Sequence, residues 1–309
     1  MRESLSTSLT VEIVHVNTQK NHMATTFDLT ISCDHSNAQR ALRLLHRCHA
    51  FIEQIESELT EFRPESPIYQ LNHAATGVRV SLPVSACEIL ERAEALRTLT
   101  QGAFDCLAKS QIPSLDDRPI QFNSKTKQAW KTDPAGWLGL GAIGKGYALD
   151  RIRLLIEQEG FENYLLNAGG SSLILSGWAG QERPWIWGWS WKKDEQNNPL
   201  GLILTHRSGK PIAIGVSGLH EKGNHLIDPR ISHLSRTAPA TLSTSLVATN
   251  SAMDADALST AQFILGFEDM KIALQQLPLT AAAAVITLAE VPNWNREFQK
   301  NWGNPIFDR

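Results

Sequence analysis

The chain has 309 residues, of which 42% are hydrophobic and 20% are charged, fractions that are typical of a soluble globular enzyme. Its net charge of −3 and pI near 6.4, with lysines and arginines scattered along the chain, argue against nucleic acid or a membrane surface as the main partner. No stretch approaches the roughly 20 apolar residues of a membrane span, and the polar residues 1–21 lack a secretory signal, so we expect a cytoplasmic protein without a membrane span.

Two strands and two helices are predicted in the first hundred residues. Residues 11–16 alternate in the manner of an edge strand, and residues 27–33 continue as a second strand. Ser85 and Glu88 have the spacing of a capping box, which opens a helix that ends near Gly102. A longer helix between them is predicted from apolar residues that recur every three or four positions, namely Ala41, Leu45, Cys48, Ile52, Ile55 and Leu59.

The rest of the chain combines runs of strands with two further helices. Residues 109–134 are polar and contain three prolines, so we expect a long surface connection there. Helices are predicted at 147–159 and 251–265, each followed by a glycine. Because the strands follow one another in runs, the order of elements indicates an α+β fold rather than a parallel βαβ sheet. These strands are predicted at 164–166, 172–175, 185–191, 200–205, 211–216 and 283–288.

Tryptophans and cysteines are further candidates for cofactor or metal binding. A row of indoles on one strand face more often covers a sheet, although it could also stack on an aromatic cofactor. The cysteines form neither a CxxC pair nor a zinc-ligand spacing, so we expect buried free thiols. The residues concerned are Trp185, Trp187, Trp189 and Trp191, and Cys33, Cys48, Cys87 and Cys106.

A glycine-rich loop leads into the predicted helix at 147–159. Four glycines lie between Gly139 and Gly146 and let the backbone approach a ligand closely. Loop amides and a helix N-terminus favour an anionic phosphate, to which Lys145 adds a positive charge. The loop is not a Walker motif, because no serine or threonine follows Lys145 in the required place.

Asp256 and Thr260 stand four residues apart in the predicted helix at 251–265 and therefore share one helix face. Together they can offer a carboxylate and a hydroxyl oxygen to a hard cation. The alternative is that Asp256 is a solvated acid of the first helical turn. Asp254 lies about 200° round the helix from Asp256, so it is not expected to share the site.

His225 precedes Asp228 by three residues in a segment that looks like a strand ending at Pro229. Its ordinary pKa lies near the working pH, so it could act as a general base. A structural role is the alternative, and it is the more common one for a single histidine.

Taken together, these segments resemble the ApbE family, the flavin transferases of the FAD:protein FMN transferase type. The family pattern is echoed in the same order over about 240 residues. The matching segments are Met23-Ala24-Thr25, Thr60 to Arg63 with Ser66, Leu71 and Asn72, Thr100 to Asp105, the glycine–lysine loop, Asn167 to Gly170, Ser217-Gly218, His225 to Pro229, and Ala255 to Thr260.

The resemblance implies a T-fold-like architecture of antiparallel sheets packed with helices, in which two lobes surround a flavin cleft. The family-like domain would span residues 23–290, after an extension at 1–22 and before a tail at 291–309. The flavin site would include Met23, Phe62, Ala103, Phe104, Asp105, Gly141, Lys145, Tyr147 and Ile227. Mg²⁺ would bind to Asp256, Thr260 and the carbonyl of Gly144, and His225 would take a proton from the incoming hydroxyl.

The activity that the resemblance implies is Mg²⁺-dependent transfer of the FMN half of FAD to a threonine of an acceptor flavoprotein, with release of AMP. Two alternatives remain open: an FAD pyrophosphatase that forms FMN and AMP, and a flavin-binding protein without catalysis. The flavin-binding alternative gains some support because the residues after Gly218 and Arg230 depart from the family pattern. Family members are often periplasmic, unlike the location expected here.

Overall fold

The computed structural model describes residues 12–110, 112, 117–193, 199–206, 209–218, 227–231, 242–277, 282–287 and 292–294. The helices are η1 (His35–Asn37), α1 (Ala38–Leu59), α2 (Pro67–His73), α3 (Val84–Leu99), α4 (Gly144–Gln158) and α5 (Ala252–Leu274). The strands are β1 (Ile13–His22), β2 (Thr25–Asp34), β3 (Val80–Ser81), β4 (Ile120–Asn123), β5 (Gln128–Lys131), β6 (Tyr164–Ala168), β7 (Ser172–Ser176), β8 (Trp185–Lys193), β9 (Pro199–His206), β10 (Ile212–Gly218), β11 (Leu242–Thr249), β12 (Ala282–Thr287) and β13 (Pro292–Trp294).

The main sheet has eight strands in the order β1-β2-β6-β7-β10-β11-β12-β13. Every neighbouring pair is antiparallel, so the predicted α+β fold with antiparallel sheets is confirmed. The residues assigned above to an N-terminal extension include β1, which forms the edge of this same sheet. The edge-strand prediction for this segment is therefore also confirmed.

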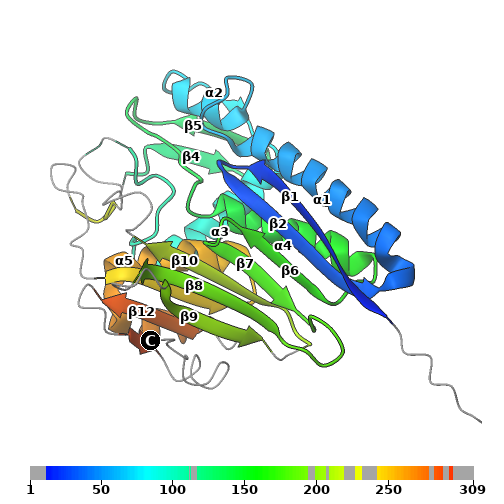
Figure 1. Cartoon of the computed structure of the whole chain (residues 1–309). Coiled ribbons are helices and arrows are strands. Elements are labelled where there is room, and N and C mark those ends of the chain that lie inside the picture. Colours follow the sequence, from blue (N-terminus) through cyan, green and yellow to red (C-terminus); the bar gives the residue numbers. More distant parts are fainter. Residues whose placement is uncertain are drawn as a thin grey trace, which may run out of the picture.

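Helices cover one face of the main sheet, and the β8–β9 hairpin covers the other (Figure 1). Phe27, Leu29 and Ile31 alternate along β2 and are fully buried on the helical face. All five residues of β7 are buried because this central strand is covered on both faces. The predicted apolar face of α1 is buried in the same core, as its periodicity indicated.

The hairpin covers the sheet with tryptophan side chains. Trp185 and Trp187 are buried against Leu173 and Leu175 of β7, and the indole N–H of Trp185 donates to the carbonyl of Ser176 at 2.7 Å. This packing favours sheet cover over cofactor stacking for these two indoles. The side chains of Trp189 and Trp191 lie outside the described residues.

A small sheet in the order β3-β5-β4 lies beside α2, near one end of α1 (Figure 1). The prediction of a long surface connection at 109–134 is therefore wrong, because this segment contains the strands β4 and β5. Each of β4 and β5 has only four residues, with a single turn between them. Such short strands among prolines leave too little periodicity to be recognised in a sequence.

The predicted capping box at the start of α3 is also wrong. The helix begins one residue earlier, after Pro83, and no side chain caps it. The hydroxyl of Ser85 donates instead to Glu58 near the end of α1. At the other end, Gln101 and Gly102 both have positive φ, as expected for a left-handed helix stop.

The other predicted helices and strands in the described residues agree with the structure in type and position. Gly266 has a φ of 78° and interrupts α5 where the sequence predicts a helix end, but helical residues resume and continue to Leu274. All four cysteines are buried and free, as expected. Within the described residues, no helix is both long and apolar enough to cross a membrane.

Candidate active site

Asp256 stands in the first half of α5 with its carboxylate buried between three elements. The hydroxyl of Ser172 in β7 donates to Oδ1 at 2.8 Å, and the backbone N–H of Gly146 in α4 donates to Oδ2 at 3.2 Å. The ammonium of Lys145 lies 3.4 and 3.5 Å from the two oxygens. Asp256 is therefore not the solvated first-turn acid of the alternative interpretation.

Two glycines allow α5 to come this close to its neighbours. A Cβ at Gly146 would stand 2.0 Å from the carbonyl oxygen of Ala252, and a Cβ at Gly215 of β10 would stand 2.1 Å from that of Ala255. Any side chain at either position would push α5 away from α4 or from the sheet. These close approaches hold the Asp256 carboxylate against Ser172 and Gly146.

Hydroxyl groups surround the next turn of α5. Thr260 and Ser259 both donate to the backbone carbonyl of Asp256, at 3.4 and 2.9 Å. Ser217, at the end of β10, lies 3.3 Å from the Thr260 hydroxyl and 2.9 Å from that of Ser259. The site thus holds one carboxylate and several neutral oxygens, which are the donors that a hard cation prefers.

Asp150 of α4 fixes the start of α5. Its carboxylate accepts from the hydroxyl of Ser251 at 2.7 Å and from the backbone N–H groups of Ala252 and Met253 at 3.0 Å each. Burial raises the pKa of Asp150, although these hydrogen bonds act in the opposite direction. The cap joins the two helices that carry the predicted phosphate and metal residues.

The glycine loop before α4 is held by a clamp from α2. The side-chain amide of Asn72 donates to the carbonyl of Leu138 at 2.9 Å and accepts from its N–H at 2.8 Å. Lys131 of β5 is buried and donates to the carbonyl of Asn72 at 3.1 Å. Gly141 is exposed, with open space at its Cβ position, so the loop presents backbone to solvent.

The turn between β1 and β2 reaches the turn between β6 and β7. Met23 and Ala24 have φ values of 49° and 58°, and His22 pairs with Thr25, so a two-residue turn joins the strands. A Cβ at Gly169 would stand 2.0 Å from the hydroxyl oxygen of Thr25. The family-like segments Met23-Ala24-Thr25 and Asn167 to Gly170, which are far apart in the sequence, therefore lie in contact.

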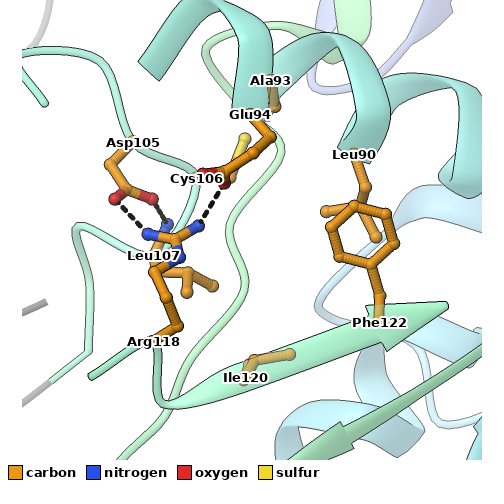
Figure 2. A pocket seen from close by; sticks show the side chains of 9 residues that line it. All are labelled: Leu90, Ala93, Glu94, Asp105, Cys106, Leu107, Arg118, Ile120 and Phe122. Carbon is orange, nitrogen blue, oxygen red and sulfur yellow. Dashed lines mark hydrogen bonds and ion pairs between the residues drawn. The ribbon is translucent and has the colours of Figure 1, made fainter. Parts of the chain in front are cut away.

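The motif Thr100 to Asp105 forms a tight turn after α3. The Thr100 hydroxyl donates to the carbonyl of Leu96 at 2.8 Å and accepts from the N–H of Phe104 at 3.1 Å. Ala103 and Phe104 are buried, at 1% and 3% exposure. Figure 2 shows Asp105 beside Arg118, whose guanidinium also donates to Glu94 at 3.0 Å.

Two aromatic residues of the predicted flavin site have contrasting environments. Phe62 is 80% exposed in the loop after α1 and can offer a free ring face. Tyr147 is 5% exposed in α4, and its hydroxyl donates to Glu88 of α3 at 2.6 Å. Burial and the neighbouring Glu88 raise the pKa of Tyr147, so the phenol stays neutral at physiological pH.

The predicted base, His225, lies outside the described residues. Ile227 is half-buried, and Asp228 accepts two charge-assisted hydrogen bonds from Arg230 at 2.9 Å each. Gly102 lies close to Arg230, because its Cβ position is 3.6 Å from Cγ of that side chain. The end of the histidine segment therefore meets the Thr100 to Asp105 motif.

The donor set fits a metal that is shared with a phosphate ligand. Among the described residues, no three His, Cys, Asp or Glu side chains gather in the manner of a protein-only metal site. Asp256 and Thr260 would supply two oxygens, and Gly144, the first residue of α4, would add a carbonyl. A cation held by so few protein oxygens must complete its shell with water and substrate, which is the usual arrangement for Mg²⁺ with phosphates.

Sequence reasoning missed three residues that organise this site, Ser172, Asp150 and Arg118, and it gave Asn72 only as part of a matching segment. Nothing in the segment that contains Asn72 indicates that its side-chain amide pairs with the backbone of Leu138. The other three contact residues at least 13 positions away. No local signal in the sequence could have revealed these pairings.

A model of the ApbE family matches residues 23–285. The FAD:protein FMN transferase of Klebsiella pneumoniae (strain 342) is 26% identical over 264 residues, which are 75% of this chain and 79% of the relative. The protein of that name from Escherichia coli (strain K12) is 23% identical over 266 residues, or 76% of this chain and 74% of the relative. These names describe a transferase, the class of enzyme that the sequence predicts.

Solved structures show the same fold. The flavin transferase ApbE from Vibrio cholerae has a TM-score of 0.78 at 19% identity, with 94% of this chain and 100% of that chain covered. The apo form of the Pseudomonas stutzeri flavinyl transferase ApbE has a TM-score of 0.76 at 21% identity, with 96% and 98% covered. Because the family model spans most of the sequence, the resemblance is confirmed, and the chain belongs to the ApbE family.

Proposed function

We propose that the chain is a Mg²⁺-dependent transferase that moves the FMN half of FAD onto a threonine hydroxyl of an acceptor flavoprotein and releases AMP. The observation that carries the proposal is the placement of Asp256. Its buried carboxylate is held by Ser172 and Gly146 beside the ammonium of Lys145, one helical turn before Thr260. This arrangement supports the proposal, because it sets a carboxylate that could bind a metal beside a lysine that could bind phosphate.

The chain's own residues would bind and orient FAD rather than form a covalent bond with it. The ammonium of Lys145 would face the pyrophosphate, and exposed Phe62 would offer a ring face to the flavin. Asp256, Thr260 and the Gly144 carbonyl would hold Mg²⁺, which supplies positive charge to the pyrophosphate when bound.

In the transfer step, the threonine oxygen forms a bond to the phosphorus on the FMN side of FAD. The bond from that phosphorus to the bridging oxygen breaks, and AMP leaves with this oxygen and its electron pair. His225 would accept the proton of the threonine hydroxyl. Both the acceptor protein and the histidine role are parts of the proposal.

Hydrolysis of FAD to FMN and AMP is the second candidate. The same site would accept water in place of threonine, with no other change in bonds. Water needs no docking surface, so departures from the family pattern after Gly218 and Arg230 do not count against this candidate.

The test is incubation of the protein with FAD, Mg²⁺ and an acceptor domain that carries a flavinylatable threonine. Covalent flavin is read as in-gel fluorescence of the denatured acceptor, and FMN and AMP are separated by chromatography. Asp256→Ala removes the proposed metal carboxylate, whereas Asp254→Ala is a matched control on the same helix, because Asp254 pairs with Arg92 instead.

The transferase is supported by a fluorescent acceptor that persists in D254A and disappears in D256A. Free FMN and AMP without a labelled acceptor would establish the pyrophosphatase instead. If FAD binds and stays intact under all conditions, both enzymatic proposals fail and a flavin-binding role replaces them.

A further inference from the structure

We propose that Arg118 is a positioning residue for the Thr100 to Asp105 turn, which it holds in the conformation that accepts FAD. The inference rests on the proposed function, since this turn belongs to the predicted flavin site. Arg118 lies outside every motif that the sequence singled out.

The Asp105 carboxylate is committed to the protein itself. Its Oδ1 accepts from the backbone N–H of Leu107 at 2.8 Å, and its Oδ2 accepts from Nη1 of Arg118. The side chain is only 3% exposed. A carboxylate with both oxygens engaged and almost no exposed surface acts by shaping its turn, because it has little free surface to offer a ligand.

Arg118 ties this turn to α3. Its Nη2 donates to Glu94 at 3.0 Å, so one guanidinium bridges a carboxylate of the turn and a carboxylate of the helix (Figure 2). Figure 2 also shows Leu90 of α3 and Phe122 of β4 at the apolar side of the small pocket in which the ion pairs lie. Apolar walls reduce the screening of these ion pairs by water.

The backbone of Arg118 is anchored in its turn. The Thr132 hydroxyl donates to the carbonyl of Arg118 at 2.9 Å, and the N–H of Thr132 donates to the carbonyl of Pro119 at 2.9 Å. Arg118 has a φ of 46°, a left-handed conformation that is unfavourable for arginine. The small sheet therefore holds the guanidinium in place at a cost in backbone energy.

Removal of Arg118 leaves the buried Asp105 charge without its partner. The turn must then rearrange so that the carboxylate reaches water, and Ala103 and Phe104 move with it. We expect Arg118→Met to weaken FAD binding about ten-fold, because FAD would then have to order the turn when it binds. The pairing also predicts a rescue: Asp105→Asn removes the stranded charge while its carbonyl can still accept from Leu107.

The experiment measures FAD dissociation constants by quenching of flavin fluorescence for wild type, R118M, the double variant R118M/D105N, and R97M. Arg97 is the matched control, because its side chain is similarly exposed and also pairs with Glu94, at 2.9 Å, but forms no ion pair with Asp105. We expect R97M to bind FAD as wild type does and the double variant to recover to within about three-fold of wild type. Thermal unfolding of each variant sets a temperature at which all are folded.

The proposal is overturned if R118M binds FAD as tightly as wild type, or if the double variant is no better than R118M, which would place Arg118 on the ligand itself. Loss of binding in R97M would also overturn it, because the effect would then run through Glu94. Hydrogen exchange of the Phe104 and Leu107 amides gives a second readout that needs no FAD and should rise in R118M only. A wild type that binds FAD but transfers no FMN would refute the proposed function and leave this result unaffected.

Discussion

Asp254 and Asp256 stand two positions apart in α5, so their side chains leave the helix in nearly opposite directions. Asp254 accepts from Nε and Nη2 of Arg92 at 2.7 and 2.5 Å and joins α5 to α3. Asp256 faces Ser172 and the start of α4 instead. The helical angle alone predicts this separation, and the contacts agree with it.

Substitution of the two aspartates should therefore separate metal binding from stability. We expect Asp256→Asn to weaken Mn²⁺ binding in the presence of FAD by more than about 100-fold, since even the loss of a ligand's supporting partner costs 10- to 100-fold. Asp254→Asn should leave the Mn²⁺ affinity unchanged and cost about 1 kcal/mol of unfolding free energy. Mn²⁺ titration followed by electron paramagnetic resonance measures the first effect and urea unfolding the second. Equal losses of metal binding in the two variants would contradict the assignment.

Ala24 occupies a backbone conformation that favours glycine. Its φ of 58° in the β1–β2 turn is left-handed, where a Cβ crowds the following carbonyl. We expect Ala24→Gly to raise the unfolding free energy by about 0.5 to 1 kcal/mol, after allowance for the more flexible unfolded chain. Urea unfolding measures the change, and Ala50→Gly in the middle of α1 is the control that should lose stability by a similar amount. A destabilised A24G would show that the alanine methyl group makes a contact worth more than the strain.

At the scale of elements, the small sheet holds the loops of the site. Lys131 of β5 supports Asn72, whose amide clamps Leu138 before the glycine loop. Thr132, which follows β5, anchors Arg118, which reaches the turn at Asp105. One hairpin thus fixes two motifs of the predicted flavin site.

The clamp can be tested through the amide that it protects. Asn72→Ala removes both hydrogen bonds and leaves the buried N–H and carbonyl of Leu138 without partners, at a cost of about 2 to 4 kcal/mol. We expect hydrogen exchange at Leu138 and along the glycine loop to accelerate. Asn123→Ala, which removes a side-chain acceptor from an exposed turn, should leave this exchange unchanged. Unaltered exchange at Leu138 in N72A would mean that other contacts hold the loop.

The elements that the sequence predicts are those with a strong internal period. The spacing of apolar residues predicts the buried face of α1 and the strands from β6 to β10. The sequence does not predict α2, β3, β4, β5, β11 and β13. The short hairpin β4–β5 gains its stability from contacts such as Lys131 with Asn72, which no local pattern encodes. Ser85 likewise has the pattern of a cap but finds a closer partner in Glu58, because α1 ends beside it.

At the scale of the whole molecule, the order of strands was beyond sequence reasoning. The chain leaves the main sheet after β7, forms β8 and β9 over its face, and returns as β10 directly beside β7. The β8–β9 hairpin covers Leu173 and Leu175 with its indole side chains, and α5 covers the opposite face of the sheet. For the candidate site, the sequence singles out Asp256 and the glycine loop, but only the fold shows that Ser172 donates to Asp256.

A buried histidine pair joins the edge of the main sheet to α1. Nε2 of His22 in β1 lies 3.1 Å from Nδ1 of His49 in α1, and Nε2 of His49 lies 3.1 Å from the hydroxyl of Thr18. Burial, with a smaller effect from His22, lowers the pKa of His49 to about 4, and burial also lowers the pKa of His22. The titratable and charged groups around the pair are Lys20 of β1 and, on α1, Glu53, Glu56 and His46, the last with the smallest effect on His49.

The fold should therefore lose stability as the pH falls through the ordinary histidine pKa. Burial disfavours protonation of both rings in the folded protein, whereas the unfolded chain takes up protons below about pH 6.5, so acid favours unfolding. The loss begins near pH 6.5 and, for His49, ends near pH 4, where the folded protein also binds the proton. Between pH 7.5 and 5.5 we expect wild type to lose about 1 kcal/mol more unfolding free energy than His49→Gln. Urea unfolding at the two pH values measures this difference, with His46→Gln as the control because His46 is exposed on the same helix. If wild type and H49Q lost stability equally while H46Q did not, the exposed histidine rather than the buried pair would link the fold to pH.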